Sequence, residues 1–317
     1  MFKETGGRST GNNRNIKKSG GHLHQTIESK YRFVKRHCSA YSVEKMCRIL
    51  QISRSSYYDW LHRRPGQRVW EDFEIARRVL ALHEECPSYG LNSIYAVIHR
   101  EIPCGRNRIC RLMKKFDIHS TRQKAFHCTT NSNHTYPIAP NLLMRNFKVN
   151  RPNRVWVSDI TYIPTDEGWL YCAIVKDLCT KQIVGHACSA KIDTQIALDA
   201  LKMAIRRERP PKNLIHHSDR GVQYASNAYR EAPAKKHIQC SMSRRGNPYD
   251  NAVAENLFSC MKCEYLYQQH FHTRLEATTA VFLYIEGFYN TRRVHSGIGY
   301  LSPLEFKHTY FSNCTAA

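Results

Sequence analysis

The sequence contains no long hydrophobic run. Its longest apolar stretch is the seven residues from Trp169 to Val175, whereas a transmembrane helix needs about 20, so no membrane span is expected. The first 21 residues are polar, rich in glycine and asparagine, and lack the apolar region of a secretory signal. The thirteen cysteines are therefore expected as free thiols in a reducing cytosol, and no disulfide framework is predicted.

Acidic residues are scarce. The 317 residues include 26 Asp+Glu against 48 Lys+Arg, which gives a net charge of +22 and favours a polyanionic partner. Residues 1–150 hold 27 Lys+Arg and 11 acids, whereas residues 151–317 hold 21 and 15. Because 42% of residues are hydrophobic, the chain can bury a core, and its length allows two domains. The first half is expected to carry a nucleic-acid-binding arm, with double-stranded DNA as the partner.

Residues 1–30 have no periodicity and are interpreted as a flexible basic tail, and residues 31–119 as a helical region. Apolar residues from Val43 to Leu50 recur at helical spacing, and Ser53 is a candidate N-cap for a second helix. The sequence at 63–66, Arg-Arg-Pro-Gly, ends that helix. Two short helices joined by a tight turn are typical of a helix-turn-helix.

A second such pair follows a longer helix expected from Val69 to Glu84. One helix is expected near Asn92 to His99, and another carries Ile109 and Phe116 on its apolar side. The basic residues of that helix, which predict a DNA-recognition helix, are Arg106, Arg108, Arg111, Lys114 and Lys115. The alternative is an ordinary helical hairpin whose solvated face happens to be basic.

Residues 120–150 are polar and are interpreted as a linker, followed by a core over 151–310 and a C-terminal tail over 311–317. The core begins with strand patterns, and a helix with Ile196 and Ala204 precedes the fourth of them. The expected strands are Val155–Ile163, Leu170–Asp177, Ile183–Ser189 and Leu214–Ser218. This order predicts an α/β fold with a mixed sheet covered by helices.

Asp159 and Asp219 are acids at unusual positions in this pattern. Strand alternation places Asp159 on the apolar face of Val155, Val157 and Ile163, where burying a carboxylate is costly unless it is compensated. A partner arginine or an edge position would explain it, and so would a metal. Asp219 directly follows the last strand, where α/β folds place their chemistry, although a turn or N-cap role is equally compatible.

Glu255 lies on a predicted helix together with Ser259 and Lys262. That face is opposite a core stripe expected to contain Val253, Leu257, Cys260 and Met261. Such a glutamate is usually only solvated. Two strand-borne aspartates and a helix-borne glutamate are, however, oxygen ligands suited to Mg²⁺ or Mn²⁺, and such a set can hold two ions for phosphoryl transfer.

These residues and the sequence around them resemble the OrfB transposase of the IS3 insertion-sequence family, with its DDE motif shared by retroviral integrases. Thirty-five residues separate Asp219 from Glu255. The segments that carry the resemblance are Ser88–Gly90, Pro140–Leu143, His217–Tyr224, Gly246–Ala252, Tyr289–Arg293 and Gly299–Pro303.

The resemblance implies an RNase H-like catalytic core and Mg²⁺-dependent strand cleavage and joining at the ends of an insertion sequence. It implies that Asp159, Asp219 and Glu255 are catalytic metal ligands, and that Lys262 contacts DNA. His217, Asp250 and Asn251 would support the site. A homo-oligomer and an OrfA partner are expected.

Two other functions remain open from the sequence. The first is an OrfB product that binds DNA without catalysis, because it needs a partner or has decayed. The second is a general RNase H-type nuclease, which the two helix-turn-helix patterns disfavour. The isolated Cys260-x-x-Cys263 pair lies in a helix without a second pair, so zinc is not expected there.

Overall fold

The computed structural model describes residues 26–121, 136–244 and 250–315. The chain divides into two compact units, Met1–Glu71 and Asp72–Ala317, which are described separately. Across the described ranges, no helix is both long and apolar enough to cross a membrane.

The first unit contains three short helices around a small apolar core. The helices are α2 (Ile27–His37), α3 (Val43–Leu50) and α4 (Arg54–His62). Val34, Met46 and Tyr57 are buried between them. The predicted N-cap is confirmed, because the Ser53 hydroxyl accepts a hydrogen bond from the backbone N–H of Ser56. The tail expected over residues 1–30 is corrected at its end, where α2 begins at Ile27, and residues 1–25 lie outside the described ranges.

The second helical group consists of α5 (Gln67–Glu85), α6 (Leu91–Glu101) and α7 (Arg106–Lys115). These are the long helix and the helix pair that the sequence predicts. Ile75, Ile94, Ile98 and Ile109 are fully buried between them. The apolar side of α7 faces this core, which leaves its basic residues toward the surface.

The predicted linker contains no helix or strand over its described residues 136–150. It is nevertheless packed against the core. Leu143 is buried in a cluster with Val155 and Val157, and the backbone N–H of Leu142 donates to the Ser241 hydroxyl.

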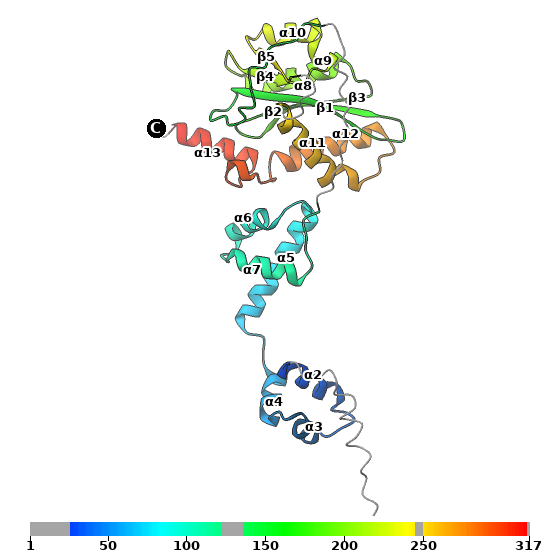
Figure 1. The fold of residues 1–317 in the computed structure, drawn as a ribbon, viewed down its shortest axis with the longest axis vertical. Helices are drawn as coiled ribbons and strands as arrows, with labels where there is room; N and C mark the ends of the chain where they lie inside the picture. The colour runs from blue at the N-terminus through cyan, green and yellow to red at the C-terminus, as the bar shows by residue number, and fades with distance from the viewer. Residues whose placement is uncertain (1–25, 122–135, 245–249, 316–317) are drawn as a thin grey trace, which may run out of the picture. The chain divides into compact units, whose positions relative to one another are not determined.

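A five-stranded sheet forms the centre of the core (Figure 1). Its spatial order is β3-β2-β1-β4-β5, with β1, β2 and β3 antiparallel and β4 and β5 added in parallel to β1. The strands are β1 (Val155–Ile163), β2 (Leu170–Asp177), β3 (Ile183–Ser189), β4 (Ile215–Ser218) and β5 (Gln239–Met242). The mixed sheet predicted from the sequence is confirmed.

Helices cover both faces of this sheet, as Figure 1 shows. On one face, α8 (Thr194–Glu208), α9 (Val222–Ala225) and α10 (Asn227–Ala234) pack around Trp156 and Val175. On the other, α11 (Ala252–Glu264) and α12 (Arg274–Phe282) pack on Ile163 and Ile174. The chain continues through η2 (Leu266–Gln268), the π-helix η3 (Leu283–Tyr289), η4 (Ser296–Ile298) and α13 (Pro303–Thr315).

Helix α13 corrects the C-terminal tail expected over residues 311–317, because the helix continues to Thr315. The apolar stripe expected on α11 is also corrected. Val253 and Cys260 are only half-buried, whereas Ala254, Phe258 and the charged Glu264 are buried.

Candidate active site

Asp159 lies on β1, the middle strand of the sheet. It is opposite Ile174 of β2 in the antiparallel register. Its side chain is half-buried, and its Oδ1 accepts a hydrogen bond from the backbone N–H of Ile160 at 2.9 Å. The neighbouring residues Val155 and Val157 are buried in an apolar cluster, as the alternation predicted.

Asp219 directly follows β4. The parallel register pairs Val157 with His217, and two further residues along both strands put Asp159 level with Asp219. The Asp219 Oδ1 accepts a hydrogen bond from the backbone N–H of Gly221 at 3.0 Å. A Cβ at Gly221 would lie 2.8 Å from the Gln223 Oε1 and 3.1 Å from the Asp219 Oδ1, so only glycine fits there without displacing these side chains.

Glu255 lies in the first turn of α11 and is exposed. Partial desolvation and the negative charge of Asp219 raise the pKa of its carboxyl group. Burial raises the pKa of Asp159 well above its ordinary value, and the charges of Asp219 and Glu255 raise it further. The Ile160 N–H and the Lys262 ammonium only partly offset this. The fold therefore places three acids within electrostatic reach of one another.

The three carboxylates are close without being a tight cluster. Among the described residues, the one set of three ligand-type side chains with all donor atoms within 4.8 Å is Asp166, His270 and His272, which is a different group. Tyr224 is a neighbour that the sequence did not single out. Its phenol is buried, has no hydrogen-bond partner within the described ranges, and has a pKa raised by burial, Tyr229, Asp159 and Asp219.

His217 is fully buried beneath Asp219 and joins β4 to β5. Its Nδ1 lies 2.8 Å from the Ser241 hydroxyl, and its Nε2 lies 3.1 Å from the Ser243 hydroxyl. Burial lowers its pKa to about 4, so the imidazole is neutral at pH 7. His216 is buried 2.6 Å from the Ser158 hydroxyl, and burial lowers its pKa to about 3. Both rings are thus engaged in the sheet.

Asp250 anchors the chain just before α11. Its fully buried carboxylate accepts hydrogen bonds from the Arg244 side chain at 2.9 Å, the Arg145 Nε at 2.9 Å and the Asn141 Nδ2 at 3.0 Å. The Arg244 guanidinium is the largest influence and holds the pKa of Asp250 well below its usual range. Asn251 is buried next to it at the N-cap position of α11, where its backbone C=O accepts from the N–H groups of Ala254 and Glu255 and its side chain makes no capping hydrogen bond. This arrangement fixes the start of the helix that carries Glu255.

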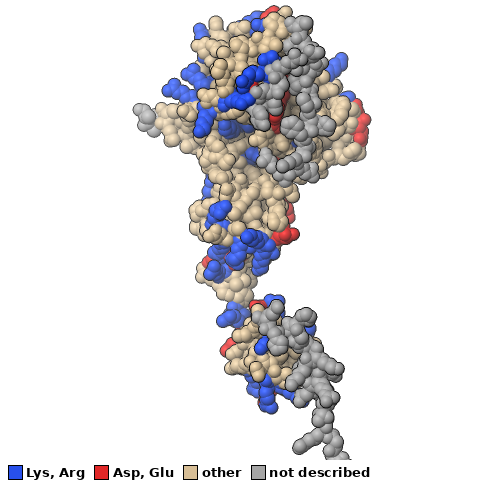
Figure 2. Space-filling view, in the orientation of Figure 1, with Lys and Arg blue, Asp and Glu red and all other residues tan. Residues whose placement is uncertain are grey.

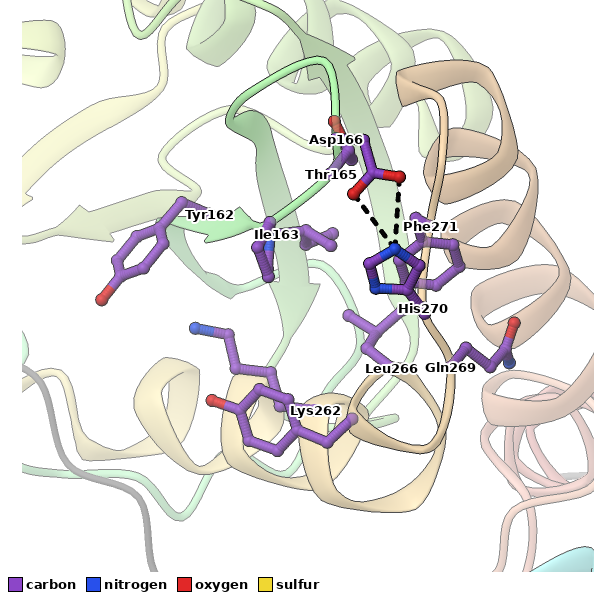
Figure 3. Close-up of a pocket in the computed structure, with 11 residues that line it drawn as sticks. Tyr162, Ile163, Thr165, Asp166, Lys262, Leu266, Gln269, His270 and Phe271 are labelled. Atoms are coloured by element: carbon purple, nitrogen blue, oxygen red, sulfur yellow. Dashed lines mark hydrogen bonds and ion pairs between the residues drawn. The ribbon is translucent and has the colours of Figure 1, made fainter.

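Lys262 lies two turns after Glu255 on α11. Its Nζ stands 4.6 Å from the centre of the Tyr162 ring, and burial lowers its pKa, partly offset by Asp159. Both side chains border a pocket of about 210 Å³ between the end of β1 and the end of α11 (Figure 3). None of the three carboxylates lines this pocket.

The other end of α11 carries a second acid, Glu264, which the sequence reasoning missed. Arg293 donates to both of its carboxylate oxygens, at 2.6 and 2.8 Å, and Ser88 and Tyr284 donate at 2.7 and 2.8 Å. The Glu264 side chain is only 2% exposed. Burial raises its pKa, but the Arg293 guanidinium outweighs that effect and leaves it below the ordinary value.

The buried Glu264 explains two of the sequence segments noted above. Ser88 bonds to Glu264, and the hydroxyl of Tyr89 accepts from the backbone N–H of Val294 at 2.8 Å. Asn290 is buried and bonds to both the N–H and the C=O of Ile183 at the start of β3. Ser88 and Tyr89 join the helical group α5–α7 to the core, and Asn290 joins the end of η3 to β3 within the core, so these residues have a structural role.

The basic residues of the predicted recognition helix α7 differ in their contacts and exposure. Arg108 and Arg111 both bind Asp72 of α5, at 2.7 and 2.6 Å, and their contact with DNA stays a prediction. Arg106 donates to the Asn92 side chain at 3.0 Å. Lys114 and Lys115 are exposed in the last turn. Figure 2 shows Lys and Arg gathered on this part of the surface.

Comparison with known proteins decides the family. Models described as integrase core domains match residues 149–248 and 236–303, and an HTH-like domain model matches residues 70–126. The transposase InsF of insertion sequence IS3A from Escherichia coli is 35% identical over 283 residues, which are 88% of this chain and 98% of that protein. The chain belongs to the IS3 family of insertion-sequence transposases.

Other relatives agree with this assignment. The transposase of insertion sequence element IS904 from Lactococcus lactis is 37% identical, over 78% of this chain and 98% of that protein. An uncharacterized 31 kDa protein of insertion element IS600 from Shigella sonnei is 40% identical, over 84% and 98%. A solved chain of the simian T-cell lymphotropic virus intasome has 17% identity and a TM-score of 0.44, and covers 67% of this chain and 74% of its own.

Membership of the family confirms three expectations from the sequence. The core has the RNase H-like integrase fold, the α5–α7 region is an HTH-like domain, and the protein is a polynucleotidyl transferase that acts in DNA transposition.

Proposed function

We propose that this transposase cleaves DNA at the ends of its insertion sequence and joins those ends to a second site, with Asp159, Asp219 and Glu255 as catalytic residues. The observation that most supports this is the convergence of three acids, where burial first, and then the negative charge of Asp219, raises the pKa of Asp159 and of Glu255. Clusters of like charge that destabilise a fold are typical of functional sites. In a chain with a net charge of +22, such a cluster also stands out from its surroundings.

The donor set fits a hard divalent cation. All three side chains offer carboxylate oxygens, which Mg²⁺ and Mn²⁺ prefer, and a cation would relieve their repulsion. Asp159, Asp219 and Glu255 would hold the metal, and three carboxylates can serve two ions. When bound, the metal would polarise the phosphodiester and neutralise the charge that develops on its oxygens.

The protein's own residues would bind and orient the DNA. Lys262, on the same helix as Glu255, is placed to contact a phosphate near the reacting strand. Lys114 and Lys115 of α7 would contact the DNA backbone, as would Arg106 after release from Asn92. His217, Asp250 and Asn251 would act as positioning residues, because they hold β4 and the start of α11 in place.

The reaction would proceed in two steps. Water attacks a phosphodiester at the end of the element, breaks the P–O3′ bond and leaves a 3′-hydroxyl. That hydroxyl then attacks a phosphodiester of the second DNA strand, forms a new P–O bond and displaces the 3′-oxygen of the second strand, which leaves as a 3′-hydroxyl. Both ends of an element must be held at once, so we expect a homo-oligomer, with the OrfA product as a possible further partner.

The test is a cleavage assay with purified protein, a labelled duplex carrying the end of the element, and either Mg²⁺ or EDTA. We expect nicking only with Mg²⁺, and a rate lower by about 10³-fold or more in Asp219→Asn, as is typical for loss of a central catalytic group. DNA affinity should change by less than about twofold, because the carboxylate makes no favourable contact with the DNA backbone.

Asp199→Asn is the matched control, because Asp199 is an exposed aspartate of α8 outside the site. It should nick like the wild type. Equal nicking by Asp219→Asn would overturn the proposed site. Binding without nicking in the wild type, also with OrfA added, would favour the DNA-binding protein without catalysis.

A further inference from the structure

A second group of ligand-type side chains lies where two loops of the core meet. Asp166 is in the turn between β1 and β2, and His270 and His272 are in the segment between η2 and α12. The His272 Nδ1 lies 2.7 Å from the Asp166 Oδ2, and the His270 Nε2 lies 3.0 Å from its Oδ1. One atom of each residue lies within 4.8 Å of the other two, and all three side chains are exposed. Figure 3 shows Asp166 and His270 facing each other beside the pocket.

We propose that Asp166, His270 and His272 form a binding site for one transition-metal ion of the Zn²⁺ class. Two imidazole nitrogens and one carboxylate oxygen are a ligand set that Zn²⁺ takes in proteins, with the fourth position left to water. Imidazole disfavours Mg²⁺, whereas the all-oxygen set of Asp159, Asp219 and Glu255 suits it. The two sites therefore differ in residues and in metal preference.

The two loops are held together by contacts that do not involve the three ligand atoms. The backbone N–H of Asp166 donates to the Phe271 C=O at 3.1 Å, and the backbone N–H of Arg274 donates to the Glu167 Oε2 at 2.9 Å. The Arg274 guanidinium also donates to the Trp169 C=O at 3.1 Å. A preformed framework lowers the ordering cost of binding a metal.

The shape of the turn depends on Gly168. Its φ is +101°, a conformation that favours glycine, and a Cβ there would stand 3.0 Å from the Arg274 Nη2. Gly168 therefore lets the turn pack closely against the segment that carries the histidines. Asp166 is presented to them by this backbone geometry, and not by the Asp–His contacts alone.

The alternative is a surface ion pair. Both imidazoles are more than 70% exposed. Exposed ion pairs of this kind contribute about 0–1 kcal/mol to stability. So small a contribution gives little reason for the three side chains to lie together. A metal would have a definite consequence. It would link the loop that follows β1 to the segment that follows α11. Strand β1 carries Asp159, and helix α11 carries Glu255 and Lys262.

The test uses metal-free protein without an affinity tag, titrated with Zn²⁺ against a chromogenic chelator in excess Mg²⁺. The wild type should bind one more equivalent of Zn²⁺ than the double variant His270→Asn/His272→Asn. Asp166→Asn should lower the affinity for that Zn²⁺ ion by about tenfold or more, since even residues that only bond to the ligands of a metal contribute about 10–100-fold to metal affinity. Zn²⁺ should raise the melting temperature of the wild type and leave that of the double variant unchanged.

The matched control is His237→Asn/His308→Asn, the same exchange at two exposed histidines elsewhere, and it should bind like the wild type. Co²⁺ provides a check against the cysteines, because a nitrogen–oxygen site lacks the thiolate charge-transfer band. Equal Zn²⁺ stoichiometry and affinity in the wild type and the double variant would overturn the proposal, as would a thiolate band from the bound equivalent. These readouts do not depend on DNA cleavage.

Discussion

The two ends of helix α11 carry acids of opposite character. Near its start, Glu255 has an exposed residue surface, and partial desolvation of its carboxyl group together with the charge of Asp219 raises its pKa. At its end, Glu264 is buried, but Arg293, Ser88 and Tyr284 satisfy its oxygens, so its pKa is lowered. Paired charge holds a fold together, whereas a cluster of like charge weakens it and is retained for another purpose. Helix α11 thus has a structural cluster around Glu264 at one end and the proposed catalytic residues at the other.

The largest effect on stability should come from breaking the paired end. Glu264→Ala leaves the Arg293 guanidinium buried without a partner, and removing one member of a buried pair typically costs about 3–5 kcal/mol. Chemical denaturation should show this decrease in the free energy of unfolding. Glu264→Gln, which keeps the size of the side chain, should cost less. Unchanged stability in both variants would show that the pair is not structural.

The buried histidines should make stability depend on pH. The pKa of His217 is lowered to about 4, against an ordinary value near 6.5, so the unfolded chain binds its proton first as the pH falls. Stability present above pH 6.5 should be lost between about pH 6.5 and 4, at up to about 1.4 kcal/mol per pH unit for one proton.

The check is denaturant unfolding measured across this pH range. His217→Asn should lower the slope of stability against pH by about one proton. The remaining slope should have the same sign, because His216, whose pKa is also lowered, contributes to it. An identical slope in the variant would contradict a neutral, buried His217.

The three acids near the start of α11 should respond in the opposite direction. In EDTA, Asp159→Asn removes one of three repelling charges, so the free energy of unfolding should rise by about 0.5–2 kcal/mol, a common gain when a functional site is relieved of strain. The raised pKa means that the folded wild type holds the Asp159 proton to a higher pH than the unfolded chain does. The gain should therefore be absent below the unfolded pKa, near 4, grow as the pH rises above it, and be full above the raised folded pKa of Asp159.

Asp199→Asn, at an exposed position of α8, should show neither the gain nor its pH dependence. A lower stability of Asp159→Asn at pH 7 would mean that the carboxylate is compensated in the folded protein.

The smallest effect concerns the cations of α7. Lys114→Ala/Lys115→Ala should reduce the slope of log affinity for DNA against log salt by about 0.9 for each phosphate that the variant no longer binds. Arg108→Ala/Arg111→Ala is the informative comparison, because both side chains are bound to Asp72. That variant should change the slope less and lower the melting temperature of α5–α7. If the arginine variant changes the slope more than the lysine variant does, the arginines leave Asp72 to bind DNA.

The sequence predicted the elements whose residues carry a local pattern. Strands β1, β2 and β3 begin and end as expected, because alternation and β-branched residues mark them. Strand β5 was missed, since its four residues are too short for a pattern and it depends on pairing with β4. The π-helix η3 was missed as well, because its hydrogen-bond pattern leaves no trace in the spacing of apolar residues.

The candidate site divides in the same way. Asp159 was singled out because it interrupts an apolar strand face, Asp219 because it directly follows a strand, and Glu255 because 35 residues separate it from Asp219. Glu264 was missed, because what makes it buried is Arg293, 29 residues away, and Ser88, 176 residues away. Asp166 was missed for the same reason, since His270 and His272 follow it by 104 and 106 residues.

One measurement tests the central contrast directly. Glu255→Gln and Glu264→Ala should be assayed in parallel for Mg²⁺-dependent nicking and for the free energy of unfolding, each on the same preparation. We expect Glu255→Gln to lose nicking while its stability stays at or above the wild-type value, and Glu264→Ala to lose stability while its folded fraction still nicks. Wild-type nicking by Glu255→Gln, or loss of nicking by a fully stable Glu264→Ala, would contradict the assignment of chemistry to one end of α11 and structure to the other.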